Sequence, residues 1–259
     1  MSTRSPAEPP SRDPPSDAFR PADEVVKEIH AALERESRVR LHQYPIKIEY
    51  TRGVAILDGE VRDIAAKKLA LERAAAVVGV RGVVDRLRIA PAEQLGDGAM
   101  RDWLSRALLA QGEFNACSID VLSKAEPRSV RTVSPPAAGH VYIEVHNGMI
   151  VLDGTVPSLA HKRLAGVLAW WTPGCRDVVN SLAVEPPEDD TDDEVLDAFR
   201  LVLEVDPLLQ PEQVTATCRD YVVTLDGYVR TEEERHRAED DAWALFAVNK
   251  VVNRIRVRA

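Results

Sequence analysis

Leu57-Asp58-Gly59-Glu60-Val61, Leu152-Asp153-Gly154-Thr155-Val156 and Leu225-Asp226-Gly227-Tyr228-Val229 are three copies of one pattern, Leu-Asp-Gly-x-Val. A Val-Val pair follows each copy at a fixed distance. From Gly59 to Val84, from Gly154 to Val179 and from Gly227 to Val252 the step is 25 residues. Self-similarity at a fixed spacing indicates one structural unit that is used three times.

The first copy shows what the unit contains. Apolar residues at helical spacing predict a helix over residues 23–39, and alternation at Ile46, Ile48 and Tyr50 predicts a half-buried strand. Residues 54–61 form the return strand of a hairpin, a second helix covers 63–78, and a strand covers 83–89. The order is αββαβ.

The other copies repeat these elements. Asp63, Ser158 and Thr231 stand four residues after the repeated glycines, and all three are good helix N-caps. We therefore predict an α+β protein of three tandem αββαβ domains, each a three-stranded sheet with two helices on one face. The expected boundaries are a disordered tail at 1–21 and domains at 22–91, 98–186 and 191–259. An insertion at about 115–139 is expected to be a mobile loop of the second domain.

The hairpin pattern G-x-x-x-L-D-G-x-V and the closing V-V-[ND]-x-[LI]-x-V resemble the BON domain family, known from OsmY-like stress proteins. The resemblance covers the chain from Asp23 onward as three copies. Tyr221 departs from it, because the first two copies carry Gly53 and Gly148 at this turn position. The resemblance implies non-enzymatic binding to phospholipid surfaces, other envelope components or partner proteins.

The composition of the chain excludes some classes of function and indicates a cellular compartment. A formal net charge of −9 argues against a nucleic-acid binder. The chain has no apolar run long enough to span a bilayer, and its N-terminus has no secretory h-region. Three cysteines without a CxxC pair fit reduced thiols. Members of the resembled family are often periplasmic, whereas these features predict a cytoplasmic protein, peripheral at the inner membrane.

No pattern of catalysis is present. The chain lacks GxSxG, P-loop, GxGxxG and HExxH motifs, so we expect no enzyme activity, no catalytic residues and no cofactor. His140, Tyr142, Glu144 and His146 alternate on one strand face and could hold a metal, but a solvated polar face is the simpler reading, and no metal site is predicted. We assign the repeated Gly59, Gly154 and Gly227 to structural turns. Asp85, Asn180 and Asn253 recur where a short polar side chain satisfies nearby backbone.

Strand parity predicts which side chains the helices leave uncovered. The open faces of the first and third units carry apolar residues rimmed by Arg86, Arg88, Arg254 and Arg256. Such faces either pack between the three units or meet an external partner.

The second helix of the middle unit, residues 158–171, contains no acidic residue. Trp170 falls on the side of His161, Lys162 and Arg163, a composition typical of an interfacial membrane contact. The alternative is that Trp170 packs under the insertion or against a neighbouring unit.

We therefore expect a stress-linked binding protein whose ligand is an anionic phospholipid surface or an envelope partner. His161, Lys162, Arg163, Trp170 and the four arginines are its candidate contacts. The alternative is an intracellular scaffold or small-ligand sensor that binds through open sheet faces or between domains. The oligomeric state is left open, with a homo-oligomer as one option.

Overall fold

The computed structural model describes residues 20–123, 126–134 and 137–258. The predicted tail at 1–21 lies outside this part of the chain, apart from its last two residues. Domain 1 has the predicted element order, with α1 (Ala22–Glu34), β1 (Ile46–Thr51), β2 (Val54–Val61), α2 (Ile64–Ala75) and β3 (Gly82–Ile89).

Domain 3 repeats that order with a divided last strand. Its elements are α5 (Asp192–Val205), a 3-10 turn at Pro211–Gln213, β10 (Val214–Arg219), β11 (Val222–Val229), α6 (Glu232–Ala244), β12 (Lys250–Asn253) and β13 (Arg256–Val257). In both domains the hairpin is antiparallel, and the strand after the second helix pairs parallel to the hairpin's second strand. The central strand is therefore β2 or β11, and the α+β prediction is confirmed.

Domain 2 has the same plan with additions. Its elements are α3 (Asp97–Ala110), a 3-10 turn at Gly112–Ala116, β4 (Cys117–Ser123), β5 (Glu126–Arg131), β6 (Gly139–His146), β7 (Met149–Val156), α4 (Leu159–Trp171), β8 (Asp177–Asn180) and β9 (Ala183–Val184). The prediction that 115–139 is a loop was wrong. Strand β4 runs parallel to β6 and extends the sheet, with Ile119 and Val121 buried in the core.

The three second helices begin at the predicted caps. The Asp63 Oδ1 accepts the backbone N–H of Ala66 at 2.8 Å, and Ser158 and Thr231 cap α4 and α6 in the same way. These bonds satisfy amides that the first helical turn leaves free.

The repeated glycines do not lie in turns, so that prediction was wrong. Gly59, Gly154 and Gly227 lie inside β2, β7 and β11, with φ angles of 148°, 109° and 129°. A Cβ on Gly59 would lie 2.6 Å from the carbonyl oxygen of Pro45, because the neighbouring strand approaches there. The repeat therefore requires glycine for both backbone conformation and space.

The first hairpin turn is equally tight in all three domains. Asp220 and Tyr221 have φ angles of 52° and 59°, the left-handed conformation that Arg52-Gly53 and Asn147-Gly148 also adopt. The Asp192 carboxylate accepts the backbone N–H groups of Asp220 and Tyr221, each at 2.8 Å. These bonds hold a turn that lacks the usual glycine.

The side chains of Asp85, Asn180 and Asn253 satisfy backbone groups, as predicted. Each accepts the N–H two residues further on, at 2.9, 3.3 and 3.1 Å respectively. In domains 2 and 3 this bond lies where the last strand divides into two short pieces.

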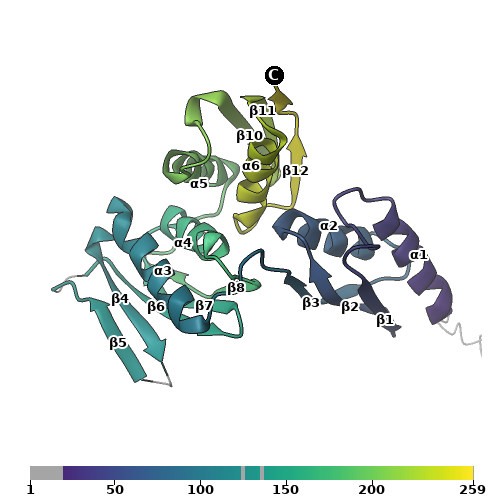
Figure 1. Ribbon diagram of the computed structural model, residues 1–259, viewed down its shortest axis with the longest axis horizontal. Coiled ribbons are helices and arrows are strands. Elements are labelled where there is room, and N and C mark those ends of the chain that lie inside the picture. Colours follow the sequence, from purple (N-terminus) through teal and green to yellow (C-terminus); the bar gives the residue numbers. More distant parts are fainter. Residues whose placement is uncertain (1–19, 124–125, 135–136, 259) are drawn as a thin grey trace, which may run out of the picture.

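The second helices of the three domains meet in the middle of the molecule, and the ends of β3 and β8 approach each other below them (Figure 1). Helix α6 packs against both α2 and α4. Ion pairs join the domains: Lys67 to Asp177 at 2.7 Å, and Arg38 to Asp240 at 2.8 Å. The centres of the open sheet faces of domains 1 and 2 stay accessible, since Val84 and Val179 remain 40% and 42% exposed.

Candidate functional site

The outer sheet face of domain 3 is strongly basic. On β10, β11 and the last two strands, side chains that alternate with the buried Val223, Leu225 and Val229 point away from the helices. Five basic residues belong to this set, and all are exposed. We call them the arginine face: Arg219, Lys250, Arg254, Arg256 and Arg258.

Strand register places these residues across the sheet. Val222 is paired with Arg219 on one side and with Lys250 on the other. At the opposite end, Tyr228 is paired with Arg256. Within the described residues, no ion pair joins any member of the arginine face to a carboxylate. On these strands the face therefore carries five basic residues and one exposed acid, Asp226, so it has a net positive charge on an acidic chain.

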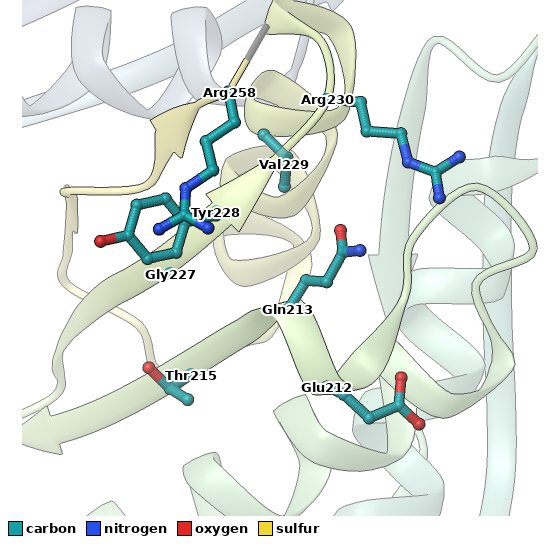
Figure 2. A pocket seen from close by; sticks show the side chains of 8 residues that line it. All are labelled: Glu212, Gln213, Thr215, Gly227, Tyr228, Val229, Arg230 and Arg258. Atoms are coloured by element: carbon teal, nitrogen blue, oxygen red, sulfur yellow. The ribbon is translucent and has the colours of Figure 1, made fainter.

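Tyr228 and Arg258 form the most structured part of this face. The guanidinium of Arg258 lies 3.6 Å from the centroid of the Tyr228 ring, and Figure 2 shows it stacked on that ring. Beside them is an open hollow of about 420 Å³, which Arg230, Thr215 and the acidic Glu212 also line. An arginine on an aromatic ring keeps its N–H groups free at the edge, where they can donate to an anion.

The equivalent face of domain 1 is charge-balanced. Lys47 pairs with Glu49 at 2.6 Å, and Arg86 stands in register with Asp58. Arg88 bonds Asp177 of domain 2 at 2.7 Å, so this predicted contact belongs to a domain interface. Arg86 is exposed, but its face carries acids in similar number.

Sequence comparison places these three units in a known family. A model of the BON domain matches residues 22–91, 131–186 and 191–259. The chain belongs to the BON domain family. None of the curated proteins matches it.

Two solved structures align with most of the chain at low similarity. Both are of CdsD, a structural protein of the type III secretion system of Chlamydia trachomatis. One covers its C-terminal domain, with 14% identity, 91% of this chain, 98% of that chain and a TM-score of 0.22. The other has 15% identity, covers 91% and 92% of the two chains, and has the same TM-score. A TM-score this low carries no argument about function.

The outer face of the second BON domain holds the alternating histidines. The Nε2 atom of His140 lies 2.7 Å from the Asp120 carboxylate, and its ring stacks on Tyr142 at 4.3 Å. His146 pairs with Glu144 at 2.6 Å. Among the described residues, no three His, Cys, Asp or Glu side chains are grouped so that they could hold a metal ion.

Helix α4 of the second BON domain is not an exposed surface helix. Arg163 is completely buried and bonds Asp190 at 2.5 Å, while its guanidinium lies 4.4 Å from the Phe246 ring of domain 3. His161 is half-buried and contacts the carbonyl oxygen of Glu113 at 2.9 Å. The prediction that Arg163 contacts a lipid surface was therefore wrong, because its side chain is inaccessible.

The other predicted contact residues of α4, Lys162 and Trp170, also lie where domains 2 and 3 meet. Lys162 Nζ lies 5.0 Å from the Phe246 ring, and Trp170 packs half-buried against the shared core of domains 2 and 3. The alternative that Trp170 contacts a neighbouring unit is the one the structure bears out. The burial could not be read from the sequence, because the partner of Arg163 is 27 residues further along the chain.

The cysteines are poorly suited to nucleophilic chemistry. All three are free thiols. Burial is the first cause that raises the pKa of Cys175 and of Cys218 to about 12. Both side chains are therefore protonated thiols at neutral pH, whereas a catalytic cysteine requires the thiolate.

Proposed function

We propose that this BON protein is a non-enzymatic binding protein that docks on anionic phospholipid surfaces through the arginine face of domain 3. The observation that carries the proposal is the group of five exposed basic side chains that form no ion pair with any carboxylate in the part of the chain that the structure describes. Each basic residue near an anionic bilayer contributes about 1 kcal/mol, so five together supply roughly 5 kcal/mol.

The positions of the acidic residues in domain 3 support an orientation in which the arginine face is turned toward the membrane. The first turn of α6 carries Glu232, Glu233 and Glu234, and the first turn of α5 carries three further acids. Both helices cover the sheet face opposite the arginine face. Because screening reduces charge effects beyond about 8–10 Å at physiological salt, the basic face is attracted while the acidic side lies further from the membrane. A net charge of −9 is therefore compatible with local binding.

We place this activity at the cytoplasmic side of the inner membrane, with a role in stress. The three free thiols support a reducing compartment. No helix in the part of the chain that the structure describes is long and apolar enough to cross a bilayer, so the proposed association is peripheral.

The second candidate function is binding of a solute or a protein in place of a membrane. The hollow beside Tyr228 has the volume of a small-ligand site, which favours a sensor or scaffold that recognises an anionic group on a solute or protein. A small-ligand sensor binds its solute in the absence of a membrane, whereas the proposed function requires a phospholipid surface.

Vesicle co-sedimentation tests the proposal. The full chain is spun with phosphatidylglycerol-containing vesicles and with phosphatidylcholine vesicles, at low and high salt. We expect binding to the anionic vesicles alone, and its loss at high salt because the contact is electrostatic. Absence of binding to anionic vesicles at low salt contradicts the lipid proposal and leaves the second candidate.

A further inference from the structure

A small cavity lies where the second helices of the three domains meet. It has a volume of about 180 Å³ and is lined by Lys68 of α2, Arg163 and Gly166 of α4, and the segment that ends α6. Trp243 and Phe246 come from that segment. The cavity touches all three BON domains and is separate from the arginine face.

Its buried wall carries hydrogen-bond donors that have no acceptor. Arg163 is fully buried, and its Nη2 atom bonds Asp190, but its Nε and Nη1 atoms have no hydrogen-bond partner among the described residues. Trp243 is 2% exposed, and its Nε1 atom also has none. Buried N–H groups without acceptors are rare in native proteins, because desolvation without a replacement bond is unfavourable.

The third donor is Lys68, which differs sharply from its neighbour. Lys67 donates to the carbonyl oxygen of Leu87 and pairs with Asp85 and Asp177. Lys68 has no ion pair within the described residues, and burial is the main cause that lowers its pKa. None of the described residues that line the cavity has a carboxylate. Two cations and an indole N–H therefore surround this space, and only Arg163 of the two has a carboxylate partner in the described part of the chain, Asp190.

We propose that this cavity binds a phosphate group, free or as a monoester, held by Arg163, Lys68 and the indole N–H of Trp243. A phosphate oxyanion accepts several hydrogen bonds at once, which matches donors that come from three helices or their ends. The volume is below the roughly 300 Å³ typical of sites for drug-sized ligands, so the pocket suits a small anion. The adjoining hollow, which shares Trp170, is lined by Asp63, Asp240 and Asp241 and is unsuited to an anion.

This site is independent of the membrane proposal. The bound group would contact all three domains, so it would stabilise their arrangement whether or not the arginine face binds lipid. A ligand that binds only the native arrangement raises the melting temperature in proportion to its occupancy.

The test is calorimetric titration of the full chain, with inorganic phosphate and glycerol 3-phosphate as separate probes and with chloride at matched ionic strength. We expect saturable binding at millimolar concentrations or tighter, and a rise in melting temperature. Equal binding of the two probes indicates that the phosphate group is sufficient. Preference for the monoester indicates that the attached group also contacts the protein.

Three variants locate the site. Lys68→Gln removes a half-buried cation and should weaken phosphate binding about tenfold or more, since charged donors contribute more than neutral ones. Trp243→Phe removes one N–H and should weaken it less. Lys162→Gln is the matched control, because Lys162 contacts Phe246 but does not line the cavity. Circular dichroism confirms that each variant is folded.

Two outcomes would overturn the proposal. One is the absence of saturable phosphate binding to the unmodified chain at millimolar concentrations. The other is binding that Lys68→Gln leaves unchanged while Arg254→Glu with Arg256→Glu removes it, which would assign the anion to the arginine face.

Discussion

The sheets of domains 1 and 3 have the same fold, but the outer face is charge-balanced in domain 1 and basic in domain 3. In domain 1 two of the three cations on this face have ion-pair partners, Lys47 in Glu49 and Arg88 in Asp177. In domain 3 no described carboxylate pairs with Arg254 or Arg256. The αββαβ framework therefore sets which positions are exposed, and the residues placed there decide whether a face can attract an anion.

The largest expected effect comes from reversing charge on domain 3. Arg254→Glu with Arg256→Glu removes two attractive charges and adds two repulsive ones, about 4 kcal/mol in all, so affinity for anionic vesicles should fall roughly a thousandfold. Co-sedimentation measures it. The matched control is Lys47→Glu with Arg86→Glu on domain 1, which should change affinity little. Equal losses in both variants would show that total charge, and not the arginine face, determines binding.

The converse experiment converts domain 1 into a basic face. Glu49 and Asp58 are exposed, so Glu49→Lys with Asp58→Lys should leave stability within about 1 kcal/mol. Affinity for anionic vesicles should rise about tenfold, because a second face can then bind. Glu49→Gln with Asp58→Asn should give a smaller increase. No increase in either variant would indicate that basic charge on this sheet is insufficient.

The features that could be predicted from the sequence are those determined by residues close together in the chain. The repeat from Gly59 to Val84, the cap at Asp63 and the parity of the sheet faces are local patterns, and they led to the correct fold. The strand β4 was missed because it is stabilised by parallel pairing with β6, across a connection that the other two copies lack. A cationic helix without acids suggested exposure at Arg163, but burial depended on Asp190 and Phe246 from the following domain.

The contact between domains 1 and 3 should depend on pH through Asp240. Burial, with Asp63 nearby, raises the pKa of this carboxyl to about 7. The folded protein then holds the proton more tightly than the unfolded chain, so the free energy of unfolding should fall as pH rises from about 4 to about 7 and level off above.

Asp240→Asn should remove the part of the pH dependence of the unfolding free energy that comes from this carboxyl. Urea denaturation at pH 4 and pH 8 should show the variant close to the unmodified chain at pH 4 and more stable, on the order of 2 kcal/mol, at pH 8. Asp226→Asn, on an exposed strand position, serves as the control. Identical pH dependence with and without Asp240 would contradict this account of the interface.

The smallest effect is expected at Tyr228. Tyr228→Ala removes the ring that positions Arg258, an interaction of about 0.5–1 kcal/mol at an exposed site, so vesicle affinity should fall about threefold without a change in melting temperature. Tyr142→Ala on domain 2 should have no effect on affinity. A larger loss of vesicle affinity for Tyr142→Ala than for Tyr228→Ala would place the binding face on domain 2 and contradict the proposal.

The most direct test compares matched positions on the two faces. Val84 of domain 1 and Val252 of domain 3 occupy equivalent strand positions, paired with Ile56 and Thr224. An environment-sensitive fluorophore is attached at Val84→Cys or Val252→Cys, in a chain that carries Cys218→Ser. Addition of phosphatidylglycerol vesicles should shift the emission of the fluorophore at position 252 to shorter wavelength and leave that at position 84 unchanged. A shift at position 84 alone, or equal shifts at both positions, would contradict the assignment of membrane binding to the arginine face.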